Sequence, residues 1–419
     1  MREEKFTILK ALAILLVVLS HAGACGWINQ TIFIFHVPIF FFCAGYFFNT
    51  AYLNDERTYI VHRIKGLYLP FVRWSIFFLL IHNLLFYTGI LNETYGNSGG
   101  GVTHPFTWHT FSQNLWNIVF NMSGYDTFLC GTFWFFRSLL LASIAFLVLF
   151  KIITKVNEKY GEKKIGWIIL VLAMLMMLWK TTEGLNVTGV AQGGARELTG
   201  LGFMAMGFLA NRYELVSHLN WKTVIPFAVF LVCAASMFPS AMYWRPTFAQ
   251  FIYLPIAAFS GFVVCLYLSM KIEKHIKFLS LVLIYIGQRT LYIFAFHLVA
   301  FKLVSALKVA WYDLPWLAVG GHPYVLEPAN NAFWVIAYVV VGVGLPLLWL
   351  EGYRRLSDKY DITNRQIVRY IVLLLCLLAK CLRFILHKTW IIFKNLCRQI
   401  WAFIKEMIEA SNVKDEDDR

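Results

Sequence analysis

The sequence predicts an all-α protein that crosses a membrane many times, and composition, apolar runs and charge distribution each indicate this. Of the 419 residues, 59% are hydrophobic and 14% are charged, and the mean hydropathy is +0.63. A soluble globular protein has roughly 25% charged residues and 45–50% apolar ones. Long apolar runs recur along the chain, and Lys and Arg are concentrated in alternate connecting segments. These features exclude a soluble enzyme, a disordered chain and a disulfide scaffold.

About ten of the apolar runs are long enough to span a membrane, which takes roughly 20 mostly apolar residues in a helix. Helices are expected because lipid cannot satisfy the polar groups of an open backbone. The predicted spans are residues 7–25, 31–50, 68–91, 130–151, 165–181, 197–211, 223–238, 248–270, 282–309 and 332–353. The sixth is short and rich in glycine.

The basic residues predict that both termini are cytoplasmic, because cytoplasmic loops are enriched in Lys and Arg. Such residues occur in segments 51–67, 152–164 and 271–281 and after the tenth span, but not in 26–30, 92–129 or 310–331. The formal net charge of +14 is therefore interpreted as an orientation signal. No nucleic-acid partner is expected.

The chain divides into a predicted membrane domain, residues 1–355, and a tail, residues 356–419. After an apolar start, the tail has basic residues among apolar and aromatic ones at helical spacing: Lys380, Arg383, Lys388, Lys394, Arg398 and Lys405. This pattern is typical of an amphipathic helix that binds the lipid of an anionic leaflet. The tail is therefore predicted to be such a helix on the cytoplasmic face.

Two segments allow alternative interpretations. Ala22–Ala24, after the first apolar run, resembles a signal-peptide cleavage site, but the acidic Glu3 and Glu4 favour a retained span. The longest expected outer segment, 92–129, is either a disordered connector or a lid or sugar platform, in which Trp108 and Trp116 would stack on the sugar rings.

Several ionisable residues lie inside the predicted spans, where they are costly and usually mark function. They are Lys10, His21, His36, Arg73, His82, Arg137, Arg289, His297 and Lys302. For His82 and Lys302 a structural role is expected. The eight Cys form no CxxC pair and no zinc-type spacing, so no metal site is predicted.

Lys10 and His21 are eleven positions apart, which is about three helical turns, so they share one face of the first span. The rise between them is roughly 16 Å. Histidine is the natural general base near neutral pH. A cation at one end of the span and an imidazole deeper in it suggest a passage in which Lys10 acts electrostatically and His21 acts on a proton.

Further motifs accompany this pair. The second span contains His36, Pro38, Phe41, Phe42 and Gly45, and later motif residues are Arg63–Pro70, Trp134, Phe135, Leu139 and Ile286–Ile293 with His297. In combination these residues, over roughly 1–355, resemble the acyltransferase-3 family of bacterial integral membrane acyltransferases. The chain departs from the family pattern at Thr7, Ala44 and Thr290.

The resemblance implies transfer of an acyl group, most often acetyl, from cytoplasmic acyl-CoA to a hydroxyl of an exported or lipid-linked glycan in the bacterial plasma membrane. Acetyl-CoA is then a co-substrate, and no bound cofactor is expected. The family's catalytic His corresponds to His21 and its donor-binding cation to Lys10.

The remaining candidate site residues are grouped by expected role. Arg63, Lys65 and Arg289 are predicted to bind the phosphates of coenzyme A together with Lys10. His36, Arg137 and His297 are predicted to hold the acceptor or stabilise an oxyanion. His21 is either a general base or a nucleophile that transiently carries the acyl group.

Two other functions remain open at this stage. Intramembrane His, Arg and Lys also suit a transporter or exporter of a polar solute or polysaccharide. A non-catalytic subunit of a glycan-synthesis complex is the third interpretation. A homodimer or a contact with the glycan-synthesis machinery is compatible with each of them.

Overall fold

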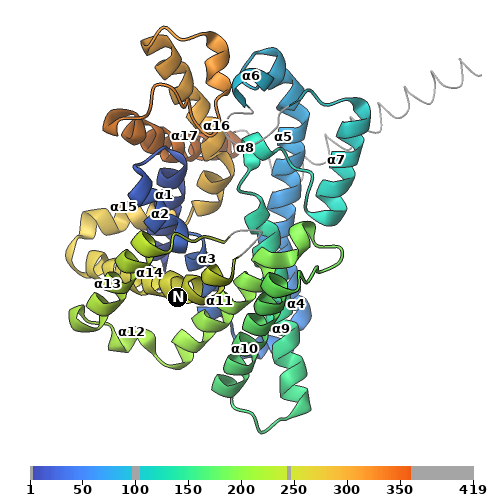
Figure 1. The fold of residues 1–419 in the computed structure, drawn as a ribbon, viewed down its shortest axis with the longest axis vertical. Coiled ribbons are helices and arrows are strands. Elements are labelled where there is room, and N and C mark those ends of the chain that lie inside the picture. The colour runs from blue at the N-terminus through green and yellow to red at the C-terminus, as the bar shows by residue number, and fades with distance from the viewer. Residues whose placement is uncertain (1–2, 97–103, 243–246, 360–419) are drawn as a thin grey trace, which may run out of the picture. The chain divides into compact units, whose positions relative to one another are not determined.

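The computed structural model describes residues 3–96, 104–242 and 247–359, and every regular element in these ranges is a helix or a helical turn (Figure 1). The chain separates into two compact units, Met1–Trp349 and Leu350–Arg419. The predicted amphipathic tail helix lies outside the described residues. The description below concerns the first unit.

Seventeen α-helices form the described part of the chain. The first nine are α1 (Glu4–His21), α2 (Gly26–Phe35), α3 (Pro38–Tyr46), α4 (Glu56–Arg63), α5 (Leu69–Tyr87), α6 (Glu93–Gly96), α7 (Trp108–Asn121), α8 (Thr127–Cys130) and α9 (Trp134–Val156). The others are α10 (Glu162–Thr182), α11 (Ala195–Arg212), α12 (Leu215–His218), α13 (Trp221–Met237), α14 (Phe248–His275), α15 (Lys277–Gly287), α16 (Thr290–Trp311) and α17 (Ala332–Lys359).

Seven helical segments in the described ranges are long and apolar enough to cross a membrane. They are Gly26–Tyr46, Glu56–Tyr87, Trp134–Val156, Glu162–Thr182, Phe251–His275, Thr290–Trp311 and Ala332–Ser357. The helices α13 and α15 are apolar but shorter. The all-α, multi-pass prediction is confirmed, whereas the count of about ten spans is not established by this criterion.

Several predicted boundaries were wrong. The single span expected at 282–309 is two helices, because α15 ends at Gly287 and α16 begins at Thr290. The segment 26–30, expected to be a loop, is the first part of α2. An apolar run alone did not reveal these ends, since apolar residues continue on both sides of the short break between α15 and α16.

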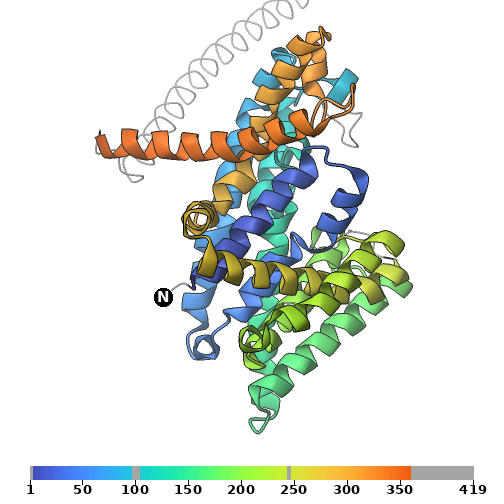
Figure 2. The same ribbon diagram turned by 90° about the vertical axis from the view of Figure 1, so that its left-hand side faces the viewer.

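The first helix, α1, forms the centre of the described fold. Ten of its residues are buried, and it packs against α2, α3, α14, α15 and α16 (Figure 2). These neighbours come from both halves of the chain. A helix enclosed in this way can present polar side chains to internal cavities while the lipid-facing surface stays apolar.

The contact between α3 and α11 depends on glycine. A Cβ atom on Gly45 would lie 1.8 Å from the carbonyl oxygen of Met204, and one on Gly207 would lie 2.1 Å from the carbonyl oxygen of Phe42. The two backbones therefore touch, as small residues allow in membrane helices. This crossing holds α3 beside α1.

The segment 92–129 is not a simple connector. Its described part contains α7 and α8, and the Asp126 side chain caps α8 through the amides of Phe128 and Leu129. Trp108 and Trp116 are exposed and stack on Phe111 and Phe120 of their own helix. The stretch 97–103 lies outside the described residues.

Candidate active site

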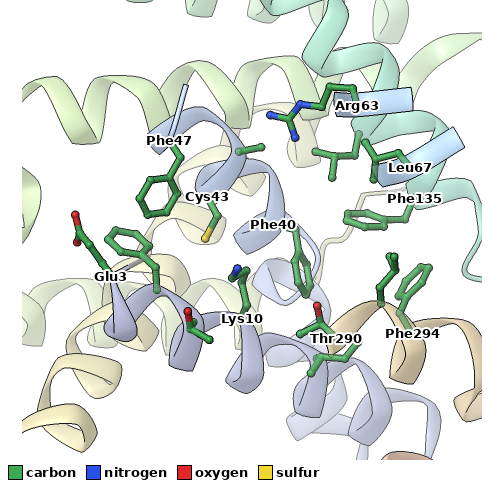
Figure 3. Close-up of a pocket in the computed structure, with 16 residues that line it drawn as sticks. Glu3, Lys10, Phe40, Cys43, Phe47, Arg63, Leu67, Phe135, Thr290 and Phe294 are labelled. Atoms are coloured by element: carbon green, nitrogen blue, oxygen red, sulfur yellow. The ribbon is translucent and has the colours of Figure 1, made fainter. Parts of the chain in front are cut away.

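Two cavities adjoin α1, one at Lys10 and one at His21. The first, called the Lys10 cavity, has a volume of about 530 Å³ and is lined from α1, α3, α4, α9 and α16 (Figure 3). The second, called the His21 cavity, has a volume of about 150 Å³. The Lys10 cavity falls within the usual range of ligand pockets, about 300–1,000 Å³.

The Lys10 cavity carries two basic side chains from different helices. Lys10 comes from α1 and Arg63 from the end of α4, where a π-helical turn, Ile64–Tyr68, leads into α5 (Figure 3). The Arg63 Nη2 donates to the Tyr59 hydroxyl over 3.1 Å. Glu3 also lines this cavity, which is otherwise largely apolar. A phosphate group with an apolar extension fits this arrangement.

Two residues predicted to join them do not line the cavity. Lys65 is exposed. The Arg289 guanidinium stacks on the ring of Tyr285, with its Cζ 3.7 Å from the ring centroid, while the next residue, Thr290, lines the cavity. The structure thus brings Lys10 and Arg63 together and separates Lys65 and Arg289 from them.

The His21 cavity is lined by two histidines, His21 and His36, with Thr132, Trp134 and Arg196. A third histidine, His297, packs edge-on against His21, with ring centroids 5.4 Å apart. Three histidines therefore lie together, from α1, the α2–α3 junction and α16.

Each of these histidines donates its Nδ1–H to a carbonyl oxygen one turn earlier. The distances are 2.8 Å from His21 to Val17, 2.6 Å from His36 to Ile32 and 3.1 Å from His297 to Ile293. A carbonyl oxygen only accepts, so the proton of each neutral ring is on Nδ1 and the lone pair is on Nε2. All three rings thus present a basic nitrogen away from their own helix.

Phe135 and Phe294 line both cavities. Their ring centroids are 5.2 Å apart, and Phe40 of the Lys10 cavity packs against Phe135 at 5.5 Å. The two cavities therefore share an aromatic boundary, defined here as Phe40, Phe135 and Phe294. A ligand that extends from Lys10 to His21 passes these rings.

The cavity with Lys10 and Arg63 therefore adjoins a second cavity in which His21 presents its Nε2, an arrangement compatible with a group-transfer reaction. Comparison with known families decides the matter, because a family model described as an acyltransferase domain matches residues 4–351. The chain belongs to the acyltransferase-3 family. No curated protein and no solved structure gives a significant match.

The three departures of this acyltransferase from the family pattern, Thr7, Ala44 and Thr290, all line the Lys10 cavity. None of them is charged, and Lys10, Arg63 and Glu3 are the charged lining residues. Among the residues described, no group of three or more His, Cys, Asp or Glu is arranged to hold a metal ion.

Arg137 is not at the cavity where it was predicted. Its Nε donates to Glu197 Oε1 over 2.9 Å, and the same oxygen accepts from the Ser138 hydroxyl over 2.8 Å. Arg137 is 4% exposed. Within the acyltransferase fold it is therefore part of a buried ion pair between α9 and α11.

Arg196 takes the place that was predicted for Arg137. It lines the His21 cavity, and its guanidinium lies over Trp134, with Cζ 4.1 Å from the ring centroid. The sequence search missed it because it precedes the predicted span 197–211 by one residue and so did not count as intramembrane. An Arg-Glu pair at the start of a glycine-rich span was the available signal.

The other buried ionisable residues hold the loops together. Lys302 Nζ donates to the carbonyl oxygens of Val319 and Gly321 over 3.1 and 2.7 Å. His82 pairs with Asp126 and stacks on Phe106. Both therefore have structural contacts and lie outside the two cavities.

Proposed function

We propose that this protein transfers an acetyl group from cytoplasmic acetyl-CoA to a hydroxyl of an exported or lipid-linked glycan at the bacterial plasma membrane. The single observation that supports this most is the pair of adjoining cavities along α1, with Lys10 at one and His21 at the other. Membership of the acyltransferase-3 family supplies the reaction class.

In the proposed complex, Lys10 and Arg63 bind the phosphates of coenzyme A. The helical rise from Lys10 to His21 is roughly 16 Å, a distance that an extended pantetheine arm covers. The arm then brings the thioester past the aromatic boundary towards His21. With both termini in the cytoplasm, as the loop charges predict, the Lys10 cavity opens on the donor's side.

His21 provides the proton transfer. Its Nδ1–H is held by the Val17 carbonyl, so the Nε2 lone pair accepts the proton of the acceptor hydroxyl. The hydroxyl oxygen attacks the thioester carbonyl carbon, the carbon–sulfur bond breaks, and coenzyme A leaves as the thiol with the proton from His21. The products are an acetyl ester and free coenzyme A.

An acyl-histidine route uses the same lone pair. There Nε2 attacks the thioester carbonyl carbon first and coenzyme A leaves as the thiolate. The acceptor hydroxyl then takes the acetyl group from Nε2, and its proton neutralises the released thiolate. Radiolabelled acetyl-CoA without acceptor separates the two routes, because only the second leaves label on the protein. His297 can assist both routes as a second proton acceptor. Its buried Nε2 has no hydrogen-bond partner among the described residues, and its ring lies next to that of His21.

The test uses purified full-length protein in lipid nanodiscs with labelled acetyl-CoA. We expect His21→Gln to lower transfer about 100- to 10,000-fold, the range lost with a general base. His218→Gln is the matched control, since His218 is exposed on α12 and lines neither active-site cavity. Normal transfer by His21→Gln contradicts the mechanism, and acetyl-CoA-independent solute uptake by vesicles would favour a transporter instead.

Mass spectrometry of surface glycans tests the acceptor class. Cells without the gene are expected to lose acetyl groups that return with the wild-type gene but not with His21→Gln. Unchanged glycan acetylation in the deletion strain would refute the proposed acceptor while leaving acyl transfer to be judged by the purified protein.

A further inference from the structure

The charges beside the His21 cavity do not balance. Two arginines, Arg137 and Arg196, lie there with one carboxylate, Glu197, and that carboxylate pairs with Arg137. Arg196 has no ion pair with a carboxylate among the described residues. Both guanidiniums stay protonated, since arginine does not lose its proton in proteins. One positive charge is therefore left over at the cavity.

The neighbouring polar groups do not supply the missing negative charge. Tyr125, in the loop before α8, faces both arginines, but burial raises the pKa of its hydroxyl to about 12 and keeps it neutral. His21 and His36 can add only positive charge. A buried or half-buried charge is normally paired, and no carboxylate of the described residues is left to match the charge of Arg196.

The hydrogen bonds of Arg196 hold it in place and leave donors over. Its Nε donates to the Met242 carbonyl over 3.0 Å and its Nη1 to Gln192 Oε1 over 3.2 Å. Both partners are neutral, and no bond from Nη2 to a described residue is formed. The planar fork of an arginine anchored in this way suits a carboxylate or a phosphate.

Trp134 adds a flat apolar surface at the same place. Its indole is covered on one side by the Arg196 guanidinium, and both residues line the cavity with His21. An aromatic face next to a cation and a general base matches a ring-shaped acceptor that bears an acidic group.

We infer that the His21 cavity binds an anionic acceptor, a sugar that carries a carboxylate or phosphate, and that Arg196 recognises its charge. The inference rests on the proposed acyl transfer for the identity of the ligand as acceptor. It adds the charge class of that acceptor and a binding residue. An oxyanion-stabilising role differs, because it would act on every acceptor equally.

Binding of defined sugars to the purified protein tests the inference independently of transfer. The probes are glucuronate, glucose 6-phosphate and glucose, and the readout is the thermal midpoint of the detergent-purified full-length protein. We expect at least one anionic sugar to raise the midpoint well beyond glucose, since a ligand stabilises the state it binds. If only glucuronate raises the midpoint, the recognised group is a carboxylate, and if only glucose 6-phosphate does, it is a phosphate.

Variants assign the effect to Arg196. Arg196→Gln is expected to lower affinity for the anionic sugar about 10- to 100-fold, the value of a hydrogen bond to a charged group, and Arg196→Lys to restore part of it. Arg73→Gln is the control, because Arg73 is exposed on α5 and should leave binding unchanged. Arg196→Lys also guards against a mere folding defect in Arg196→Gln.

Three results would overturn the inference. One is equal stabilisation by glucose and both anionic sugars, including no stabilisation by any of them. Another is anion binding that survives Arg196→Gln. The third is a transfer assay in which Arg196→Gln lowers the rate of acetyl transfer to octyl glucoside and to octyl glucuronide by the same factor. That result would indicate an oxyanion-stabilising role. Failure of wild-type protein to consume acetyl-CoA would instead refute the proposed function.

Discussion

The aromatic boundary predicts which acyl groups reach His21. Phe135 and Phe294 line both cavities, and the His21 side has a volume of about 150 Å³. This space has to admit the reacting part of the acceptor as well as the acyl group. It therefore accommodates an acetyl group but not an eight-carbon chain.

The magnitude follows from the cost of overfilling. Forcing extra methylenes into a packed site costs about 1–3 kcal/mol, and about 1.4 kcal/mol is tenfold in an equilibrium. We therefore expect the wild-type protein to prefer acetyl-CoA over octanoyl-CoA by about 10- to 100-fold in kcat/KM. Phe294→Leu and Phe135→Leu each replace a ring of the aromatic boundary by a smaller side chain. Each should reduce the preference for acetyl-CoA about tenfold.

The assay measures release of coenzyme A from both donors by purified protein in nanodiscs. Leucine is chosen because Phe→Ala in a core costs about 3–5 kcal/mol, a large fraction of the stability of a typical folded protein. Phe150→Leu is the matched control, since Phe150 is equally buried but packs against Phe48, Phe146 and Phe208. Equal use of octanoyl-CoA by the wild type, or the same change in Phe150→Leu, would refute the role of the boundary.

The remaining predictions concern donor binding and stability. Lys10→Met and Arg63→Met should each raise the KM for acetyl-CoA about tenfold or more, because each removes a charged contact to a phosphate. Lys65→Met is the control, since Lys65 is exposed and should leave the KM unchanged. Equal effects of all three variants would contradict the assigned site. Glu197→Gln should lower the free energy of unfolding by about 3–5 kcal/mol, because it leaves the Arg137 charge buried and unpaired. An unchanged thermal midpoint would show that this pair is not buried in the folded protein. Gly45→Ala should lower the thermal midpoint, since its Cβ would lie 1.8 Å from the Met204 carbonyl oxygen, and normal stability would contradict the close crossing of α3 and α11.

The sequence predicted that Lys10 and His21 share one helix because a helix has a fixed geometry. The two residues are eleven positions apart, and α1 is one continuous helix from Glu4 to His21. The register of two residues within one helix follows from roughly 3.6 residues per turn. The close approach of α3 to α11 likewise depends on a single position, because only a glycine at Gly45 admits the Met204 carbonyl.

Helix ends were harder to predict than helix existence. Apolar composition continues from α15 into α16, although Gln288 and Arg289 separate the two helices. The helices α1 and α11 are not among the seven apolar segments, because each contains too many charged residues, Lys10 and Glu197 among them. In this protein those charges belong to internal cavities and ion pairs, so hydropathy undercounts the buried helices.

The roles of Arg137 and Arg196 show what no single helix can reveal. Both are arginines near the end of an apolar segment, and by sequence Arg137 is the more unusual, since it lies inside a predicted span. In the structure Glu197 of α11 forms an ion pair with Arg137 of α9, so Arg137 has a structural contact rather than a place at the cavity. The neighbouring Arg196 is then left with its charge at the His21 cavity. Which arginine is ion-paired is decided by a carboxylate sixty residues away from Arg137, and only the packing of α9 against α11 determines it.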